Sequence, residues 1–208
     1  GHKHGVRVYP CLSDSRVQGE TRFRRSSAEG YRGRALNAWN AGADGLHLFN
    51  HFNPNVPMWK EIGDPDALAT MNKLYFVNVR DDDCRRFLAG GRDYRTVPLM
   101  GPSHPLLITA AEPVTLPIEI GDDAAEARRR GYKSEVKLHL EVPSIQRVEQ
   151  LHVKLNGTEL SGGELKDGWV DYCVPPAAVK QGMNEVQIEA DPAALGPATF
   201  ATRWTTRS

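Results

Sequence analysis

A period of two in the apolar residues dominates the second half of the chain. Between residues 114 and 120, apolar side chains at every second position alternate with Thr115, Pro117 and Glu119. Side chains of a β-strand point alternately to its two faces, so this period predicts strands that are buried on one face and solvated on the other. Antiparallel sheets are typical of such strands. Further alternating runs begin at Val136, Leu151, Val170, Val186 and Phe200.

Turn signals separate these runs. Asn156-Gly157 lies between two of them and is the strongest short-range signal of a two-residue hairpin, because both residues tolerate a positive φ. Gly162-Gly163, Asp167-Gly168 and Gly182 mark further turns. Short strands joined by close turns are typical of a β-sandwich, which we predict for residues 96–208.

Residues 1–80 follow a different pattern. A β-rich run at residues 6–12 ends in a polar segment, and apolar or small residues then recur at helical spacing from Ala28 to Trp39. Ser26 and Glu29 have the spacing of a capping box at the start of this helix. We therefore predict a strand followed by an amphipathic helix, with Trp39 on the apolar face of that helix.

A second strand-helix unit follows the first. Gly42 suits the left-handed carboxyl end of the first helix, and the run at residues 46–49 indicates a buried strand. Asp64-Pro65 predicts the start of a second helix, whose apolar stripe runs to Tyr75. This order of elements implies a right-handed parallel crossover, whose strands need cover on both faces. A break in all periodicity predicts a linker at residues 81–95.

Composition bears on the partners and the compartment. Lys+Arg and Asp+Glu both total 26, so no global basic field attracts nucleic acid. The longest apolar runs are far shorter than the ~20 residues that span a bilayer, and we expect no membrane partner. Cys11, Cys84 and Cys173 are widely spaced, and no motif has metal-ligand spacing, so we expect no metal and no cofactor. The compartment stays open, since secretion or export to the periplasm would need a signal peptide upstream of Gly1.

Residues 31–50 resemble the last helix and eighth strand of (β/α)₈-barrel glycoside hydrolases. In those proteins a helix that ends in a Gly-Ala-Asp-Gly turn is followed by a final strand reading Leu-Phe-Asn, as in residues 42–45 and 48–50 here. Residues 151–186 resemble the β-sandwich modules, often galactose-binding-like, that follow such barrels. The motifs that carry this second resemblance are Leu155-Asn156-Gly157, Val174-Pro175 and Gly182-Met183-Asn184.

The resemblance implies an α/β segment, the last two βα units of a TIM-like barrel, followed by an all-β antiparallel sandwich of jelly-roll or galactose-binding-like type. A barrel takes about 250 residues and eight strands, so the chain would be the carboxyl-terminal part of a longer protein. Two parallel strands cannot cover both of their faces, and self-association is a second way to cover them. A self-contained α/β layer packed on the sandwich is a third interpretation.

The resemblance also implies where a site would lie. Barrel enzymes carry their chemistry at the carboxyl ends of the strands. Glycoside hydrolysis usually takes two carboxylates, and Asp14 is the one candidate near a strand end, where it is alternatively a turn-forming residue. His51 either lines a sugar subsite or packs within its loop, and Trp59 either binds sugar or caps the barrel end. The expected substrate-binding residues are Tyr9, Ser13, Asn50, His51, Asn53 and Trp59.

Two functions from different classes follow. The first is the carboxyl-terminal part of a carbohydrate-active glycoside-hydrolase-like protein, in which this chain alone is not catalytically complete. The alternative is a non-catalytic carbohydrate-binding or structural interaction module, which the sandwich and the missing pair of acids favour. Carbohydrate is the partner that we expect.

Overall fold

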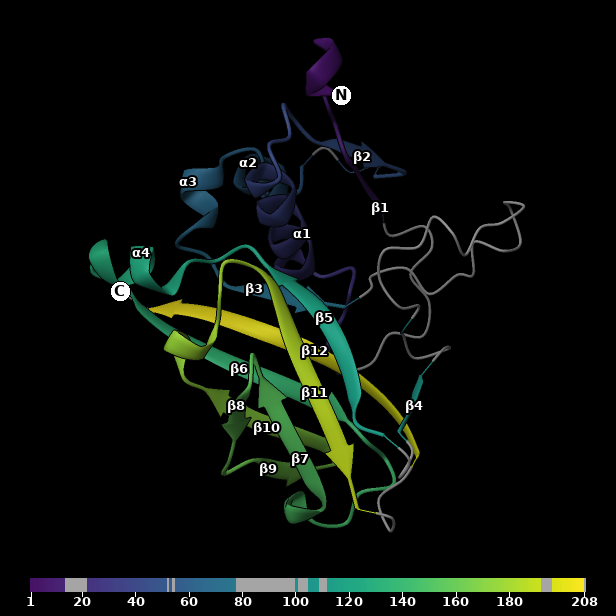
Figure 1. Ribbon diagram of the computed structural model, residues 1–208. Coiled ribbons are helices and arrows are strands. Elements are labelled where there is room, and N and C mark those ends of the chain that lie inside the picture. The colour runs from purple at the N-terminus through teal and green to yellow at the C-terminus, as the bar shows by residue number, and fades with distance from the viewer. Residues whose placement is uncertain are drawn as a thin grey trace.

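The protein, seen here in a computed structural model, consists of an antiparallel β-sandwich and a small α/β layer that is packed across one end of it (Figure 1). Its described residues are 1–13, 22–51, 53, 55–77, 100, 105–108, 112–191 and 196–207. The predicted linker at residues 81–95 lies outside them, and the boundaries at residues 80 and 96 stay a prediction.

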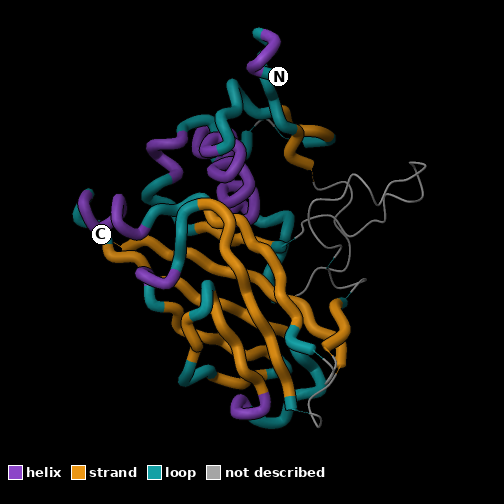
Figure 2. Tube along the Cα trace, in the orientation of Figure 1, coloured by secondary structure: helices purple, strands orange, loops and turns teal. Residues whose placement is uncertain are grey.

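Two sheets form the sandwich (Figure 2). The strands of the larger sheet are β3 (Lys73–Phe76), β4 (Leu106–Ile108), β6 (Lys133–Glu141), β9 (Glu164–Lys166), β10 (Trp169–Val174) and β12 (Gly196–Arg207). The smaller sheet contains β5 (Val114–Ile120), β7 (Leu151–Leu155), β8 (Thr158–Leu160) and β11 (Gly182–Ala190). The six-stranded sheet has the order β3-β12-β6-β10-β9, with β4 paired to β12, and the four-stranded sheet has the order β5-β11-β7-β8. Short helices α4 (Ala124–Arg129), η4 (Val148–Gln150) and η5 (Pro176–Ala178) lie between strands.

The core of the sandwich follows from the period of two. Leu116, Ile118 and Ile120 of β5 are buried in the same cluster as Leu138 and Leu140 of β6, which faces them from the other sheet. Along β5 every second residue from Leu116 to Ile120 is therefore buried, as alternation predicts. The predicted antiparallel sandwich is confirmed, whereas its finer assignment to a galactose-binding-like class stays a prediction.

The predicted hairpin is also present. Asn156 and Gly157 join β7 to β8 and have φ angles of 50° and 80°. These positive values are those that a type I′ turn requires.

The α/β layer contains η1 (His2–His4), β1 (Cys11–Ser13), α1 (Ala28–Asn40), β2 (His47–Phe49), α2 (Met58–Ile62) and α3 (Pro65–Leu68). β1 and β2 pair in parallel with Leu12 opposite Leu48, so the predicted parallel crossover is confirmed. Gly42 ends the turn after α1 with a φ of 84°. The helix is capped one residue later than predicted, because the side chain of Ser27, not Ser26, accepts a hydrogen bond from the Gly30 amide.

Three expectations for this part are wrong. The second helix does not run to Tyr75, because α3 ends at Leu68 and residues 73–76 form β3, which pairs with β12. Residues 73–76 form a strand despite the helical spacing of their apolar residues, because pairing with β12 outweighs this weak local preference. The first strand is shorter than residues 6–12, and β2 is not buried, as 47% of Phe49 is exposed.

A buried polar network joins the α/β layer to the sandwich. The side chain of Lys73 is fully buried, and its ammonium donates hydrogen bonds to the carbonyl oxygens of Leu68 (2.5 Å) and Met71 (2.6 Å). The same ammonium lies 3.0 Å from Oδ1 of Asp122. The hydroxyl of Tyr75 donates to Oδ2 of Asp122 at 2.8 Å. The network thus ties the end of α3, the edge strand β3 and the turn after β5 to one another.

Close approaches at two glycines complete the joint, by which we mean the contact between the α/β layer and the sandwich. A Cβ atom on Gly33 of α1 would lie 2.3 Å from the carbonyl oxygen of Leu74, so the helix meets β3 at a distance that a side chain would forbid. Gly121, directly after β5, is crowded by side chains of α1, those of Asn37 and Leu36. The side-chain amide of Asn40 donates to the carbonyl oxygen of Gly121 at 2.7 Å.

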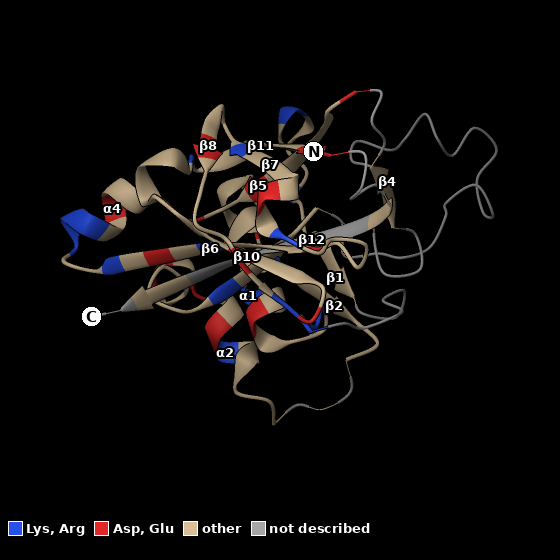
Figure 3. Ribbon diagram, turned by 90° about the horizontal axis from the view of Figure 1, so that it is seen from below, with Lys and Arg blue, Asp and Glu red and all other residues tan. Residues whose placement is uncertain are grey.

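Charges of both signs are interspersed on α1, α2, α4 and β6 (Figure 3). Among the described residues, no helix has the length and apolar character needed to cross a membrane.

Gly33→Ala tests the close approach of α1 to β3. Alanine normally favours a helix by about 0.5–1 kcal/mol over glycine, but here we expect the free energy of unfolding to fall by about 1–3 kcal/mol, because the new methyl group overpacks against the main chain. Urea denaturation measures the change. Gly63→Ala is the matched control, because its Cβ would lie 3.5 Å from the nearest carbonyl oxygen, and it should be neutral. Equal effects of the two substitutions would contradict the close approach.

The pH dependence of stability tests the buried network. Burial raises the pKa of Asp122 to about 6, and the nearby Lys73 ammonium only partly opposes this. The folded state therefore binds a proton more tightly than the unfolded state does, and stability from this group is lost as the pH rises from about 4 to about 6. The free energy of unfolding, measured in urea, should fall over this range relative to Asp122→Asn, which cannot titrate. If the difference in the free energy of unfolding between the parent chain and Asp122→Asn stays constant or rises over this range, the raised pKa of Asp122 is contradicted.

Candidate functional site

The candidate site lies at the carboxyl edge of the β1–β2 pair. Ser13 is the last residue of β1 and is opposite Phe49, the last residue of β2, so both strands end at the same edge. Asn50 follows β2 at once and has a φ of 59°, in the left-handed region that asparagine tolerates better than most residues. The chain thereby turns away from the strand and brings His51 back towards α1.

His51 packs between two aromatic rings. Its imidazole is edge-on to Tyr31 of α1, with 5.6 Å between ring centroids, and edge-on to Trp59 of α2, with 4.8 Å between centroids. Nδ1 of His51 is buried and has no hydrogen-bond partner within the described part of the chain. We call Tyr31, His51 and Trp59 the ring cluster. Tyr31 is only 1% exposed, whereas His51 and Trp59 are half-buried, so the imidazole and the indole are the rings that remain accessible.

Trp59 links the ring cluster to the loop after β2. Its indole Nε1 donates a hydrogen bond to the carbonyl oxygen of Asn53 at 2.7 Å. The side-chain Oδ1 of Asn53 accepts from the amide of Asn55 at 3.1 Å, which forms a local turn. The loop is therefore held by the same tryptophan that contacts His51.

Arg34 joins the ring cluster to β1. Its guanidinium lies 4.1 Å from the centroid of the Tyr31 ring, and Nη1 donates to the carbonyl oxygen of Ser13 at 2.9 Å. The sequence prediction missed both Tyr31 and Arg34. Their spacing of three residues in the first turns of α1 was the available signal, because a crossover helix begins at the carboxyl edge of the preceding strand.

The structure brings together Ser13, Asn50, His51, Asn53 and Trp59 of the predicted site residues. Tyr9 needs a correction, because the strand begins only at Cys11 and Tyr9 therefore lies at the amino end of β1. A Cβ atom on Gly45 would lie 2.5 Å from the Tyr9 ring, which places this tyrosine beside the turn before β2. The predicted candidate Asp14 lies outside the described residues.

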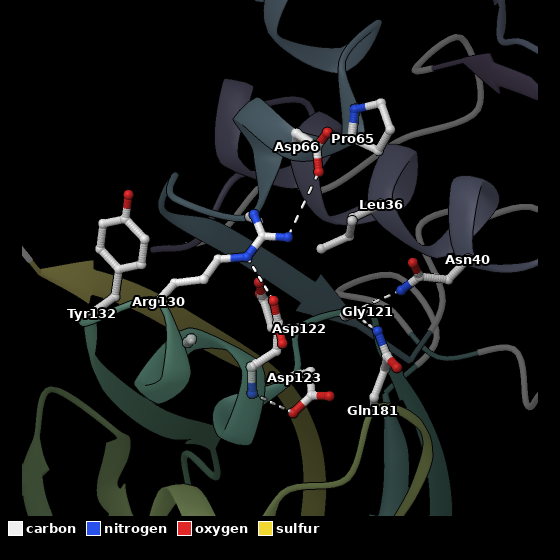
Figure 4. A pocket seen from close by; sticks show the side chains of 13 residues that line it. Leu36, Asn40, Pro65, Asp66, Gly121, Asp122, Asp123, Arg130, Tyr132 and Gln181 are labelled. Carbon is white, nitrogen blue, oxygen red and sulfur yellow. Dashed lines mark hydrogen bonds and ion pairs between the residues drawn. The ribbon is translucent and has the colours of Figure 1, made fainter.

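A cavity of about 200 Å³ lies at the joint between the α/β layer and the sandwich (Figure 4). Asn40 and Gln181 both donate side-chain hydrogen bonds to the carbonyl oxygen of Gly121, at 2.7 and 3.1 Å. Arg130 lies 3.8 Å from Asp66 across the cavity. These polar groups are paired with one another across the joint, so the cavity belongs to the contact between the two parts. No group of three or more possible metal ligands lies together within the described ranges.

Comparisons with known proteins give no family. No family model matches the sequence, and no curated protein matches it. Among the solved structures, six chains match. One of them is a β-porphyranase of glycoside hydrolase family 86 from the human gut bacterium Bacteroides plebeius. It is 12% identical, with a TM-score of 0.34 over 66% of this chain and 21% of that enzyme. The chain thus has a weak structural similarity to a glycoside hydrolase and spans about a fifth of its length.

Trp59→Phe tests the link between the indole and the ring cluster. The substitution keeps an aromatic ring but removes the hydrogen bond to Asn53, so we expect a loss of about 0.5–1.5 kcal/mol in the free energy of unfolding and a shifted imidazole NMR signal of His51. Trp39→Phe is the matched control, because its indole also donates to a main-chain carbonyl oxygen, that of Ile62, at 2.8 Å. It should cost a similar free energy and leave the His51 signal in place. A His51 signal that responds to both substitutions alike would contradict the link.

Proposed function

We propose that this chain is the carboxyl-terminal part of a glycoside-hydrolase-like protein and contributes a sugar-binding surface at the carboxyl edge of β1 and β2. In this proposal the α/β layer is the last two βα units of a barrel, and the sandwich is its appended domain. The observation that carries the proposal is the ring cluster of Tyr31, His51 and Trp59 at the end of a parallel crossover.

The location and the chemistry of the ring cluster support the proposal. Ligands of barrels and of open α/β sheets bind at the carboxyl ends of parallel strands. Ligand sites combine mostly apolar and aromatic walls with a few polar groups that fix orientation. His51, Asn50 and Asn53 supply such polar groups beside Trp59, and the side chains of Asn50 and Asn53 are exposed. Hydroxyl-rich, uncharged ligands fit this set better than anions.

The free edges of the small sheet support the barrel part of the proposal. Within the described residues β1 and β2 form a two-stranded sheet, and parallel sheets are normally larger and covered on both faces. An apolar groove of about 430 Å³ lies beside β2 and is lined in part by Trp39, Leu48 and Ile62. A second groove of about 410 Å³ beside β1 includes Val8 and Leu12. Preceding barrel units would fill both grooves, and a second copy of the chain is the competing occupant.

The proposed role is binding, with the catalytic carboxylates supplied elsewhere in the parent protein. Glycoside hydrolysis usually takes two carboxyl groups about 5–10 Å apart. The contacts of His51 with the rings of Tyr31 and Trp59 supply no carboxylate. Glu61 of α2 is held by Arg32, whose Nε donates to it at 2.8 Å.

The alternative, a sandwich that binds carbohydrate by itself, receives less support. An open aromatic platform on a sheet face would favour it. Trp169 lies on the outer face of the six-stranded sheet but is only 6% exposed, because Phe23 packs edge-on against it at 5.2 Å. The outer face of the four-stranded sheet exposes Met183 but no Phe, Tyr or Trp ring in its described part, and His152, Lys154 and Glu159 line a shallow depression on it.

Oligosaccharide binding tests the proposal. A panel of neutral oligosaccharides should yield a ligand for the 208-residue chain, and His51→Ala should weaken that ligand about tenfold in calorimetric titration, which corresponds to about 1.4 kcal/mol. His152→Ala is the matched control on the four-stranded sheet and should leave affinity unchanged. Binding that survives His51→Ala but is lost in His152→Ala would place the sugar on the sandwich and contradict the proposed surface. Failure of the whole panel would also count against it.

A further inference from the structure

An anchored segment connects the outer face of the sandwich to the start of α1. Arg22 forms a two-pronged ion pair with Asp171 of β10, with Nη1 3.2 Å from Oδ1 and Nη2 2.8 Å from Oδ2. Nδ1 of His139 on β6 lies 2.8 Å from the same Oδ1. Arg22 is therefore fixed by a carboxylate that a neighbouring strand already orients.

Phe23 is buried at the same place. It is only 3% exposed, its ring centroid lies 4.2 Å from that of His139, and Trp169 meets it edge-on. The guanidinium of Arg22 lies 5.0 Å from the centroid of the Phe23 ring. We call Arg22, Phe23, His139, Trp169 and Asp171 the anchor cluster.

The ionisation of Asp171 agrees with this arrangement. Partial burial raises the pKa of Asp171, but the hydrogen bonds from His139 and Arg22 outweigh burial and hold the pKa below its usual range. The carboxylate is thus charged at neutral pH and available to both partners.

The anchored segment leads directly into the helix that carries the ring cluster. Arg25 is 3% exposed, and its guanidinium lies over Phe76 of β3 at 5.2 Å. The amide of Ser27 donates to the carbonyl oxygen of Arg24, and Ser27 in turn caps α1. A Cβ on Gly30 would lie 2.6 Å from the Arg25 carbonyl oxygen, so the segment lies tightly against the first turn.

We propose that the six-stranded sheet positions the candidate site through this segment, with Asp171 and Arg22 as positioning residues. The anchor cluster fixes residues 22–25, these fix the first turns of α1, and Tyr31 and Arg34 in those turns hold His51 and the end of β1. The sandwich thereby acts as a support for the sugar-binding surface. This inference rests on the proposed function, because that proposal makes the ring cluster a binding site. Its test needs no ligand.

Asp171→Asn in the 208-residue chain tests the coupling. The substitution keeps the shape of the side chain but removes the charge that holds Arg22, so amide hydrogen exchange at residues 27–34 should speed up about tenfold or more while exchange in β5 and β11 stays unchanged. The imidazole NMR signal of His51 should shift. Asp191→Asn is the matched control, because it removes an exposed carboxylate 3.8 Å from His152 near the four-stranded sheet. It should change neither readout.

Rescue at Arg22 separates positioning from a general effect on stability. Arg22→Gln should reproduce both changes, and Arg22→Lys, which keeps the charge but not the two-pronged geometry, should give intermediate values. The proposal is overturned if Asp171→Asn and Arg22→Gln lower the free energy of unfolding but leave exchange at residues 27–34 and the His51 signal as in the parent chain. If these substitutions shift the imidazole NMR signal of His51 but the chain binds no oligosaccharide, the positioning role of Asp171 and Arg22 is supported and the proposed function is contradicted.

Discussion

The buried charge of Lys73 is the constraint on which the arrangement of the two parts depends. Burial lowers the pKa of Lys73 and raises that of Asp122, so each group is costly to bury without the other. Their contact, with two carbonyl oxygens and the Tyr75 hydroxyl, satisfies both only when α3, β3 and the turn after β5 are all in place. A buried ion pair of this kind adds little net stability but penalises other arrangements, and we infer that it fixes how the layer sits on the sandwich.

The position of the candidate site depends on this contact between the α/β layer and the sandwich. Gly33 lets α1 approach β3, and the start of the same helix then carries Tyr31 and Arg34 to the carboxyl edge of β1 and β2. The segment that leads into α1 is also held on the six-stranded sheet, through Arg22 and Arg25. In the proposed account these contacts support the ring cluster, which agrees with the general need of binding sites for rigid support. Within the described residues the small sheet contains β1 and β2 alone.

Local pattern was sufficient for most of the sandwich and for the parallel crossover. Alternation located strands such as β5 and β6, and Asn156-Gly157 located a hairpin, because both signals depend on neighbours in sequence. The apolar stripe that ends at Tyr75 gave a wrong prediction of helix, since residues 73–76 become a strand only by pairing with residues 201–204. His51 was predicted after a strand end and Trp59 among the substrate-binding residues, but their ring contacts depend on how α1 and α2 pack. The pair Arg22–Asp171 joins residues 149 positions apart, which no local pattern reveals.

The central claim is that the α/β layer is the end of a larger parallel sheet and not a layer complete in itself. The sequence of the parent gene upstream of the codon for Gly1 tests this most directly. The account predicts about 150–200 further residues in which strand and helix patterns alternate, because that length completes a barrel. A start codon at this position, with no such region before it, would contradict the account and leave the grooves beside β1 and β2 to a second copy of the chain.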